Sequence, residues 1–314
     1  MKTEDVIKLI INIGLILLLG NVILFAGYYL NMNYNHPGEP KLFNLFGEDT
    51  KELINVSGDA TQFMPGLRFS ESRISYFINS DCAGKKASDF EKALEIIENR
   101  TEKISFYVTN EQDAEILVGC SKDSYKTETN KFVAGEGGPT SIISYTKYPI
   151  ILKGKVILYE ETSCAIPVTE LHELLHVLGF NHINKSETIL YPYVSCNQKL
   201  DLDMIQILKE VYSVKSLPDL YFSNVTITRK EGYADMTIRI DNRGLKDSNI
   251  FEFNVYSNSE QISTKEIEGL RFGTGVIYSY EARLPSAGEN VIKLEIIANE
   301  LELDKNNNIV EMKI

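Results

Sequence analysis

Eleven residues near the middle of the chain, from His172 to His182, constrain its fold more than any other segment. They place histidine at positions 172, 176 and 182, glutamate at 173 and glycine at 179. Residues four apart on an α-helix share one face, so His172 and His176 would project side by side. Gly179 can adopt a positive φ and end the helix, after which the chain can turn back. The segment therefore predicts a helix, a sharp turn and three imidazoles around one point.

Three imidazoles with one open position are the ligand set of a catalytic zinc ion. The chain has only four histidines, and three of them lie in this segment, which favours metal binding over a chance arrangement on a polar helix face. Glu173 follows the first ligand, where a carboxylate can act as general base on a water molecule at the metal. We therefore expect one Zn²⁺ held by His172, His176 and His182, with Glu173 as the catalytic residue.

This pattern resembles the long zinc signature of the metzincin metalloproteases, and the sequence after it resembles the matrixin branch. Matrixins have a tight turn with a methionine beneath the metal. The matching run here is 188–192, with Leu190 at the methionine position. Residues 199–212 resemble the helix that closes matrixin catalytic domains. The resemblance covers roughly residues 66–215 and implies a zinc peptidase with a mixed five-stranded sheet and a long zinc helix.

Apolar and turn residues between positions 66 and 170 predict a series of short elements. Strands are expected at residues 74–78, 104–108, 115–119, 141–146 and 155–159, and a helix at residues 88–101. The glycine-rich run 135–139 predicts a flexible loop. By the resemblance, residues 141–146 would be an antiparallel edge strand beside the cleft, where an extended peptide could bind by strand addition.

Four cysteines, Cys82, Cys120, Cys164 and Cys196, all lie within the expected zinc domain. An even number in an exported chain suggests two disulfides, and four cysteines allow three pairings. We prefer Cys82–Cys120, which would join the ends of two neighbouring strands. The second bond would then be Cys164–Cys196, between the start of the zinc helix and the loop after Pro192.

The N-terminal region suggests a membrane anchor. Residues 9–30 contain no charged side chain and are dominated by Ile, Leu, Val and Phe, and a helix of 22 such residues can cross a hydrocarbon core of about 30 Å. We expect a cytoplasmic N-terminus at 1–8, a transmembrane helix at 9–30 and the rest of the chain outside the cell membrane. Secretion after signal cleavage is the alternative. Residues 31–65, rich in Asn, Gly, Pro and acids, are expected to be a stalk or a short propeptide.

The region 216–314 changes character. Its strand-like runs recur about every ten residues with alternating polarity, which predicts a β-sandwich. They lie at residues 220–228, 234–241, 249–257, 260–268, 275–282 and 290–298. Together with the turn at 241–244 and the terminal run 304–310, they resemble the CARDB modules of prokaryotic surface proteins.

The expected fold class is α+β (α/β): a metzincin-like zinc domain at 66–215, followed by an immunoglobulin-like all-β sandwich, with one N-terminal transmembrane helix. The expected function is a membrane-anchored zinc endopeptidase acting on a peptide or protein substrate. Two alternatives are a catalytically weak surface adhesion protein, whose sandwich binds a cell-surface ligand, and a zinc amidase acting on cell-wall peptides. The net charge of −12 argues against a nucleic-acid partner.

Overall fold

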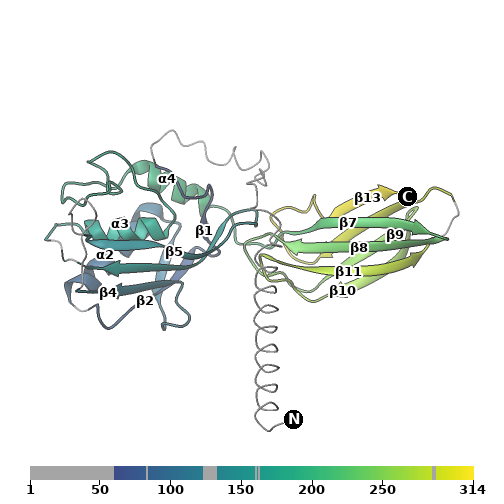
Figure 1. Cartoon of the computed structure of the whole chain (residues 1–314), viewed down its shortest axis with the longest axis horizontal. Coiled ribbons are helices and arrows are strands. Elements are labelled where there is room, and N and C mark those ends of the chain that lie inside the picture. Colours follow the sequence, from purple (N-terminus) through teal and green to yellow (C-terminus); the bar gives the residue numbers. More distant parts are fainter. Residues whose placement is uncertain (1–59, 83, 123–132, 160, 162, 285–287) are drawn as a thin grey trace, which may run out of the picture. The chain divides into compact units, whose positions relative to one another are not determined.

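The computed structural model describes residues 60–314 except 83, 123–132, 160, 162 and 285–287 (Figure 1). Two separate hydrophobic cores lie within these residues. One is built from side chains between Ala60 and Tyr212, and the other from side chains between Leu220 and Ile296. The expected anchor at 9–30 and most of the expected stalk at 31–65 lie outside the described residues.

The N-terminal core contains a six-stranded sheet. Its strands are β1 (Arg68–Phe69), β2 (Arg73–Ile78), β3 (Ser105–Val108), β4 (Ile116–Cys120), β5 (Gly135–Ile143) and β6 (Ile150–Leu158). The order is β1-β6-β4-β2-β3, and β5 pairs with β6. All pairings are parallel except β5 with β6, which is antiparallel. The sheet therefore has one strand more than the expected five, because β1 is too short to give a recognisable sequence pattern.

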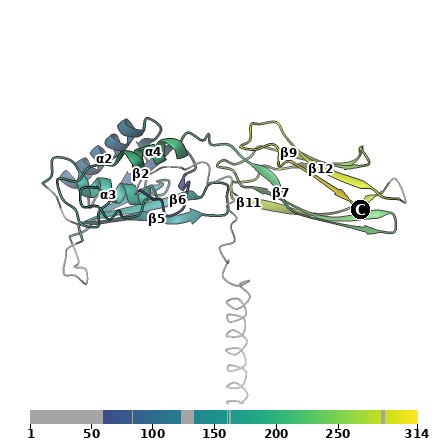
Figure 2. The same cartoon turned by 90° about the horizontal axis from the view of Figure 1, so that it is seen from above.

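Three helices, α2 (Lys85–Thr101), α3 (Val168–Val177) and α4 (Leu202–Val211), lie along one face of this sheet (Figure 2). Each buries a stripe of apolar side chains at helical spacing, which is the pattern expected of a helix packed on a core. The stripe of α2 includes Phe90, Leu94 and Ile97. All ten residues of α3 are buried, so this helix is the centre of the domain rather than its surface.

The expectation of a long zinc helix is wrong. The helix that carries His172 and His176 has only ten residues, preceded by Pro167 and followed by a turn in which Gly179 has φ 96°. A helix tolerates proline only in its first turn, and a residue with positive φ ends a helix. Both boundaries of α3 are therefore fixed by the backbone. The expected α+β class is also corrected. With thirteen strands and three helices, the described residues are mostly β.

The expected flexible loop at residues 135–139 is likewise corrected, because these residues form the first half of β5. Glycine is needed here for close packing and not for flexibility. A side chain at Gly135 or Gly137 would collide with Glu173 of α3. The missing side chains allow the strand to lie directly against the helix.

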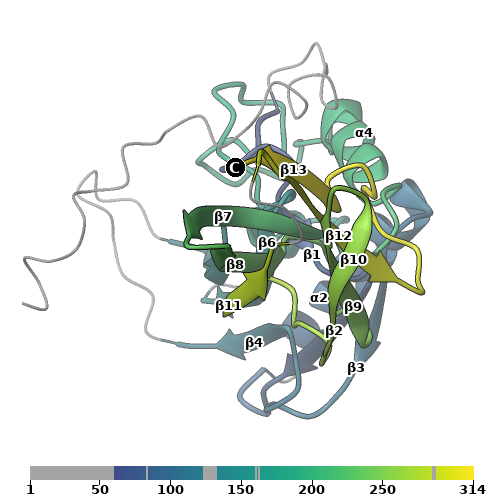
Figure 3. The ribbon, with the colours of Figure 1, turned by 90° about the vertical axis from the view of Figure 1, so that its right-hand side faces the viewer.

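The C-terminal core is a sandwich of two antiparallel sheets (Figure 3). One has the order β10-β9-β12-β13 and the other β11-β8-β7. The strands are β7 (Leu220–Lys230), β8 (Tyr233–Asn242), β9 (Phe251–Ser257), β10 (Glu260–Ile267), β11 (Thr274–Arg283), β12 (Val291–Ala298) and β13 (Ile309–Lys313). Alternate side chains such as Met236, Ile238 and Ile240 of β8 are buried between the sheets, as a strand with one face on a core requires.

The single-pass anchor expected at 9–30 falls outside the part of the chain that the structure describes. Across residues 60–314, within the described ranges, no helix combines the length and the apolar character needed to cross a bilayer.

Candidate metal centre

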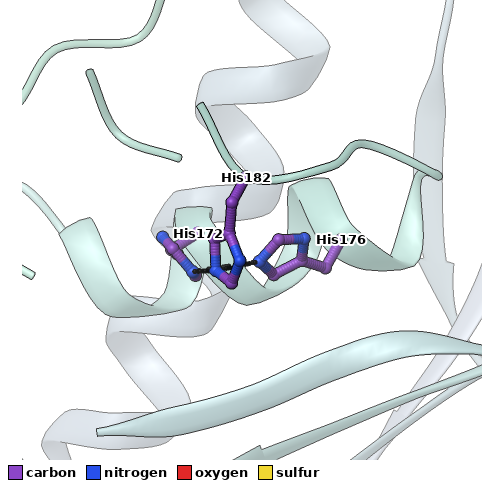
Figure 4. Close-up of side chains that lie close together, drawn as sticks. All are labelled: His172, His176 and His182. Carbon is purple, nitrogen blue, oxygen red and sulfur yellow. Dashed lines mark hydrogen bonds between the residues drawn. The ribbon is translucent and has the colours of Figure 1, made fainter. Parts of the chain in front are cut away.

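The three histidines of the motif converge on one point (Figure 4). The Nε2 atoms of His172 and His176 are 3.0 Å apart, and Nε2 of His182 lies 3.2 Å from the first and 3.1 Å from the second. Both helical histidines come from one face of α3. The turn at Gly179 reverses the chain and brings His182 over them. The arrangement is the one that the spacing of the motif predicts.

Hydrogen bonds fix the orientation of the two helical imidazoles. Nδ1 of His172 donates to the carbonyl oxygen of Ile189 at 2.7 Å, and Nδ1 of His176 donates to that of Phe180 at 2.7 Å. A carbonyl oxygen only accepts, so Nδ1 carries the hydrogen and the Nε2 lone pair faces the shared point. Lone pairs that converge in this way repel one another unless a cation lies between them.

The spacing of the donor atoms suits zinc. With Zn–N bonds of 2.0–2.1 Å, tetrahedral ligand nitrogens lie about 3.3 Å apart, close to the separations of 3.0–3.2 Å found here. Among the described side chains, this is the one group of three or more His, Cys, Asp or Glu residues whose ligand atoms lie close enough to share a metal ion. The donor set therefore fits the expected ion.

The environment keeps these ligands neutral. Burial, with a smaller contribution from the neighbouring His176, lowers the pKa of His172 to about 4. Burial also lowers the pKa of His176 and of His182. Only a neutral imidazole has a lone pair to give to a metal, so the site is poised for binding at neutral pH.

Glu173 lies beside the triad and is only 4% exposed. Burial, together with smaller contributions from the carboxylates of Glu136 and Glu170, raises its pKa to about 8. A dication at the histidines would stabilise the ionised carboxylate and would therefore lower the pKa of Glu173. A carboxylate whose pKa can be brought near neutrality is suited to accept a proton and pass it on.

Strand β5 forms one wall around this carboxylate. A Cβ atom at Gly135 would lie 2.8 Å from Cγ and 3.0 Å from Oε1 of Glu173, and one at Gly137 would overlap the Glu173 carbonyl oxygen. Gly138, by contrast, has open space at its Cβ position. The glycines therefore set how close the strand approaches the acid.

A cleft of about 710 Å³ opens over the triad. It is bounded by the start of β5, by residues 192–194 and by Phe63. The Phe63 ring stacks on His176, with centroids 6.4 Å apart and planes at 13°. Sequence reasoning missed Phe63, which falls in the segment expected to be a stalk. Its main-chain N–H donates to the Gly179 carbonyl oxygen at 2.7 Å, so it belongs to the turn of the metal motif.

Leu190, at the position of the matrixin methionine, is fully buried in the N-terminal core. Its carbonyl oxygen accepts a hydrogen bond from the N–H of Ile183, and Tyr191 closes a turn on Thr188. The preceding residue, Ile189, is the one that orients His172. The structure therefore brings this turn to the triad, and it does so through the main chain.

Both preferred disulfides are confirmed. Cys82 and Cys120 are joined with an S–S distance of 2.07 Å, and Cys164 and Cys196 with 2.02 Å. The first links the end of β4 to the segment that follows β2. The second links the segment before α3 to the loop that continues from the cleft wall at 192–194.

Residues 217–312 match the CARDB family, so the C-terminal sandwich is a CARDB domain. Among solved structures, it is similar to a CARDB domain from Pyrococcus furiosus in complex with di-metal ions. The identity is 16%, the match covers 31% of this chain and 87% of the other, and the TM-score is 0.29. A domain from Methanosarcina acetivorans, described as part of a cell-surface protein, matches with 19% identity over 31% and 90% of the two chains, TM-score 0.28.

A third similar structure is β-glucosidase 3B from Thermotoga neapolitana, at 12% identity over 31% of this chain and 16% of the enzyme, with a TM-score of 0.24. No curated protein matches the chain. The family comparison gives no protease or metzincin match. The comparisons therefore support the CARDB part of the expected resemblance, and the metzincin family label is corrected to a zinc-type histidine motif without a family match.

Proposed function

We propose that the N-terminal domain is a zinc-dependent hydrolase that cleaves peptide bonds. One observation carries this proposal: three imidazole Nε2 atoms lie 3.0–3.2 Å apart beside a buried glutamate. A triad for structural zinc alone would not need that acid or an open cleft. Structural sites are closed by a fourth protein ligand, whereas catalytic sites keep one position open.

The chain's own residues would divide the work. His172, His176 and His182 would hold zinc, which supplies Lewis-acid chemistry by activating water and polarising the scissile carbonyl. Glu173 would accept the proton of the attacking water and deliver it to the leaving amine. The narrow gap between Glu173 and Gly135 limits where the carboxylate can lie, and Glu173 lines the same cleft as the three histidines.

Strand β5 supports a peptide rather than a compact small molecule as substrate. Within the part of the chain that the structure describes, β5 pairs on one side only, with β6. Its first three residues line the cleft. An edge strand beside a hydrolytic site can bind an extended peptide through main-chain hydrogen bonds.

A second candidate function, binding at a cell surface through the sandwich, is favoured by the CARDB match. The two functions are compatible, since a binding module can deliver a hydrolase to its substrate. A catalytically weak adhesion protein would have little use for a buried Glu173 next to three oriented histidines, and we therefore place hydrolysis first.

The deciding experiment compares the wild-type protein with Glu173→Gln, which keeps the shape of the side chain but removes the base. Zinc content and cleavage of an unfolded protein are measured together, before and after chelation. We expect about one zinc per chain in both proteins, and cleavage slower by about 10²–10⁴-fold in the variant. A zinc-loaded wild type that cuts neither proteins nor cell-wall peptides would contradict the proposal, and cleavage of cell-wall peptides alone would support the amidase alternative.

A further inference from the structure

The cleft wall at residues 192–194 contains no helix or strand, so other contacts must fix it. Gln198, four residues beyond it, is only 2% exposed and carries no charge. A buried amide must find hydrogen-bond partners or destabilise the fold. The partners of Gln198 therefore indicate what it holds in place.

The Gln198 side chain bonds to the main chain on both sides of Val194. Its Nε2 donates to the carbonyl oxygen of Tyr193 at 2.8 Å, and its Oε1 accepts from the N–H of Ser195 at 2.9 Å. These two residues flank Val194. The second hydrogen of Nε2 goes to the carbonyl oxygen of Ser186 at 3.3 Å. Ser186 lies in the segment that follows the third histidine.

The same segment is connected to the metal ligands. The N–H of Lys199, next to Gln198, donates to Glu187, and Ile189 donates back to Lys199, both at 2.9 Å. The Ile189 carbonyl oxygen is the acceptor for Nδ1 of His172. One set of hydrogen bonds thus extends from the cleft wall, through Gln198 and its neighbour, to a metal-binding imidazole.

We propose that Gln198 is a positioning residue that holds the wall at Tyr193 and Val194 in register with the histidines, and so determines how tightly a substrate side chain packs beside the metal. The inference rests on the proposed function. It needs an amide at this position, because only an amide offers two donors and an acceptor in one plane. A glutamate has the same shape but places a carboxylate oxygen, which only accepts, opposite the carbonyl oxygens of Tyr193 and Ser186. Both hydrogen bonds would therefore be lost.

The test uses the full chain loaded with zinc and two variants with the same chemical change. Gln198→Glu removes the donors to the wall. Gln206→Glu is the matched control on α4, where the exposed amide of Gln206 donates to Glu210 at 2.7 Å. Two probes are titrated by calorimetry: acetohydroxamate, which reaches only the metal, and a peptide hydroxamate with a leucine side chain, which also reaches the wall.

We expect Gln198→Glu to weaken the peptide hydroxamate about tenfold, the loss that one or two buried hydrogen bonds can cause. Acetohydroxamate affinity and zinc content should stay at the wild-type level, as they should for Gln206→Glu with both probes. In turnover, KM should rise while kcat changes little.

Equal weakening of both probes, or loss of zinc, would show a general structural role and overturn the inference. So would an unchanged affinity for the peptide probe. A wild-type protein that binds zinc and the probes but hydrolyses nothing would count against the proposed function alone, because the probe titrations do not depend on turnover. A wild type that binds no zinc would overturn both.

Discussion

Ile189 orients His172: the imidazole Nδ1 donates to the Ile189 carbonyl oxygen at 2.7 Å, although 17 positions separate the two residues. The carbonyl stays in place because the next residue, Leu190, is packed in the core with no exposed surface. A leucine that touches no metal therefore helps to determine where a ligand lone pair points.

Replacing Leu190 by alanine should destabilise the fold by about 2–5 kcal/mol, because it leaves a cavity in a packed core. It should also weaken zinc binding about 10–100-fold, the usual effect of disturbing a ligand's hydrogen-bond partner. Urea unfolding and competitive zinc titration measure the two effects.

Leu190→Met is the matched control, since it conserves volume and should cost less than about 1.5 kcal/mol. If zinc affinity were unchanged in Leu190→Ala, the packing of this residue would not be what orients His172, and the prediction would be wrong.

Gly135→Ala should reduce hydrolysis with little effect on folding. The new methyl group would lie 2.8 Å from Cγ of Glu173, so the carboxylate must move. A misplacement of about 1 Å can cost about 10²-fold in rate. Steady-state kinetics, zinc content and a crystal structure of the variant should show a slow enzyme with full zinc and a displaced Glu173.

Gly138→Ala, three positions along the same strand, meets no atom within 4 Å and should behave as wild type. If both variants lost activity equally, a general sensitivity of β5 to alanine would be the cause, and not the distance to Glu173.

Glu173 should make the metal-free protein less stable as the pH rises. Its pKa is about 8 in the fold and 4.5 in a free chain, because burial disfavours the charged form. Between these values the unfolded chain releases a proton that the folded protein keeps. Each pH unit in this interval should therefore cost up to about 1.4 kcal/mol of stability.

Urea unfolding of the metal-stripped wild type and of metal-stripped Glu173→Gln, from pH 4 to pH 9, tests this directly. The two proteins should be equally stable below about pH 4.5, and the variant should become the more stable one toward pH 8. Parallel curves across the whole range would show that Glu173 is not held in its neutral form.

The two disulfides should have different effects on the cleft. They span similar separations, 32 and 38 residues, so loss of either should cost about 3–4 kcal/mol by chain entropy. Only Cys164–Cys196 borders the cleft wall. A Cys164→Ala/Cys196→Ala double variant should therefore also raise KM.

Cys82→Ala/Cys120→Ala is the control for this prediction, with a similar loss of stability and an unchanged KM. Thermal unfolding and steady-state kinetics on both double variants are required. A rise in KM in both would show that stability, and not the local link to the wall, determines substrate binding.

The sequence was informative where chemistry depends on local spacing. His172, Glu173 and His176 lie at fixed helical intervals and Gly179 turns the chain back toward His182, so their meeting could be predicted without knowing the rest of the fold. The pairing of Cys82 with Cys120 followed from two short strands expected to be neighbours. In both cases a few residues contain the whole physical argument.

Other features depended on contacts between distant segments. The glycines at 135 and 137 looked like a loop because the helix that they accommodate is remote in sequence. Phe63 looked like part of a stalk because its partner, Gly179, lies more than a hundred residues away. Gln198 gave no signal at all, since its bonds are to main-chain atoms whose positions no sequence pattern specifies.

The pairing of residues 61–63 with the turn at 179–181 has a consequence for biosynthesis. The N–H of Phe63 bonds to Gly179, and that of Asn181 bonds to Thr61. As the chain emerges from the ribosome, residues 61–63 must wait for the turn to be made, and His172 must wait for Ile189. Zinc capture should therefore come late in the synthesis of this domain, once the chain through Ile189 is free to fold, and in a nascent chain it would report that residues 61–63 have met the turn.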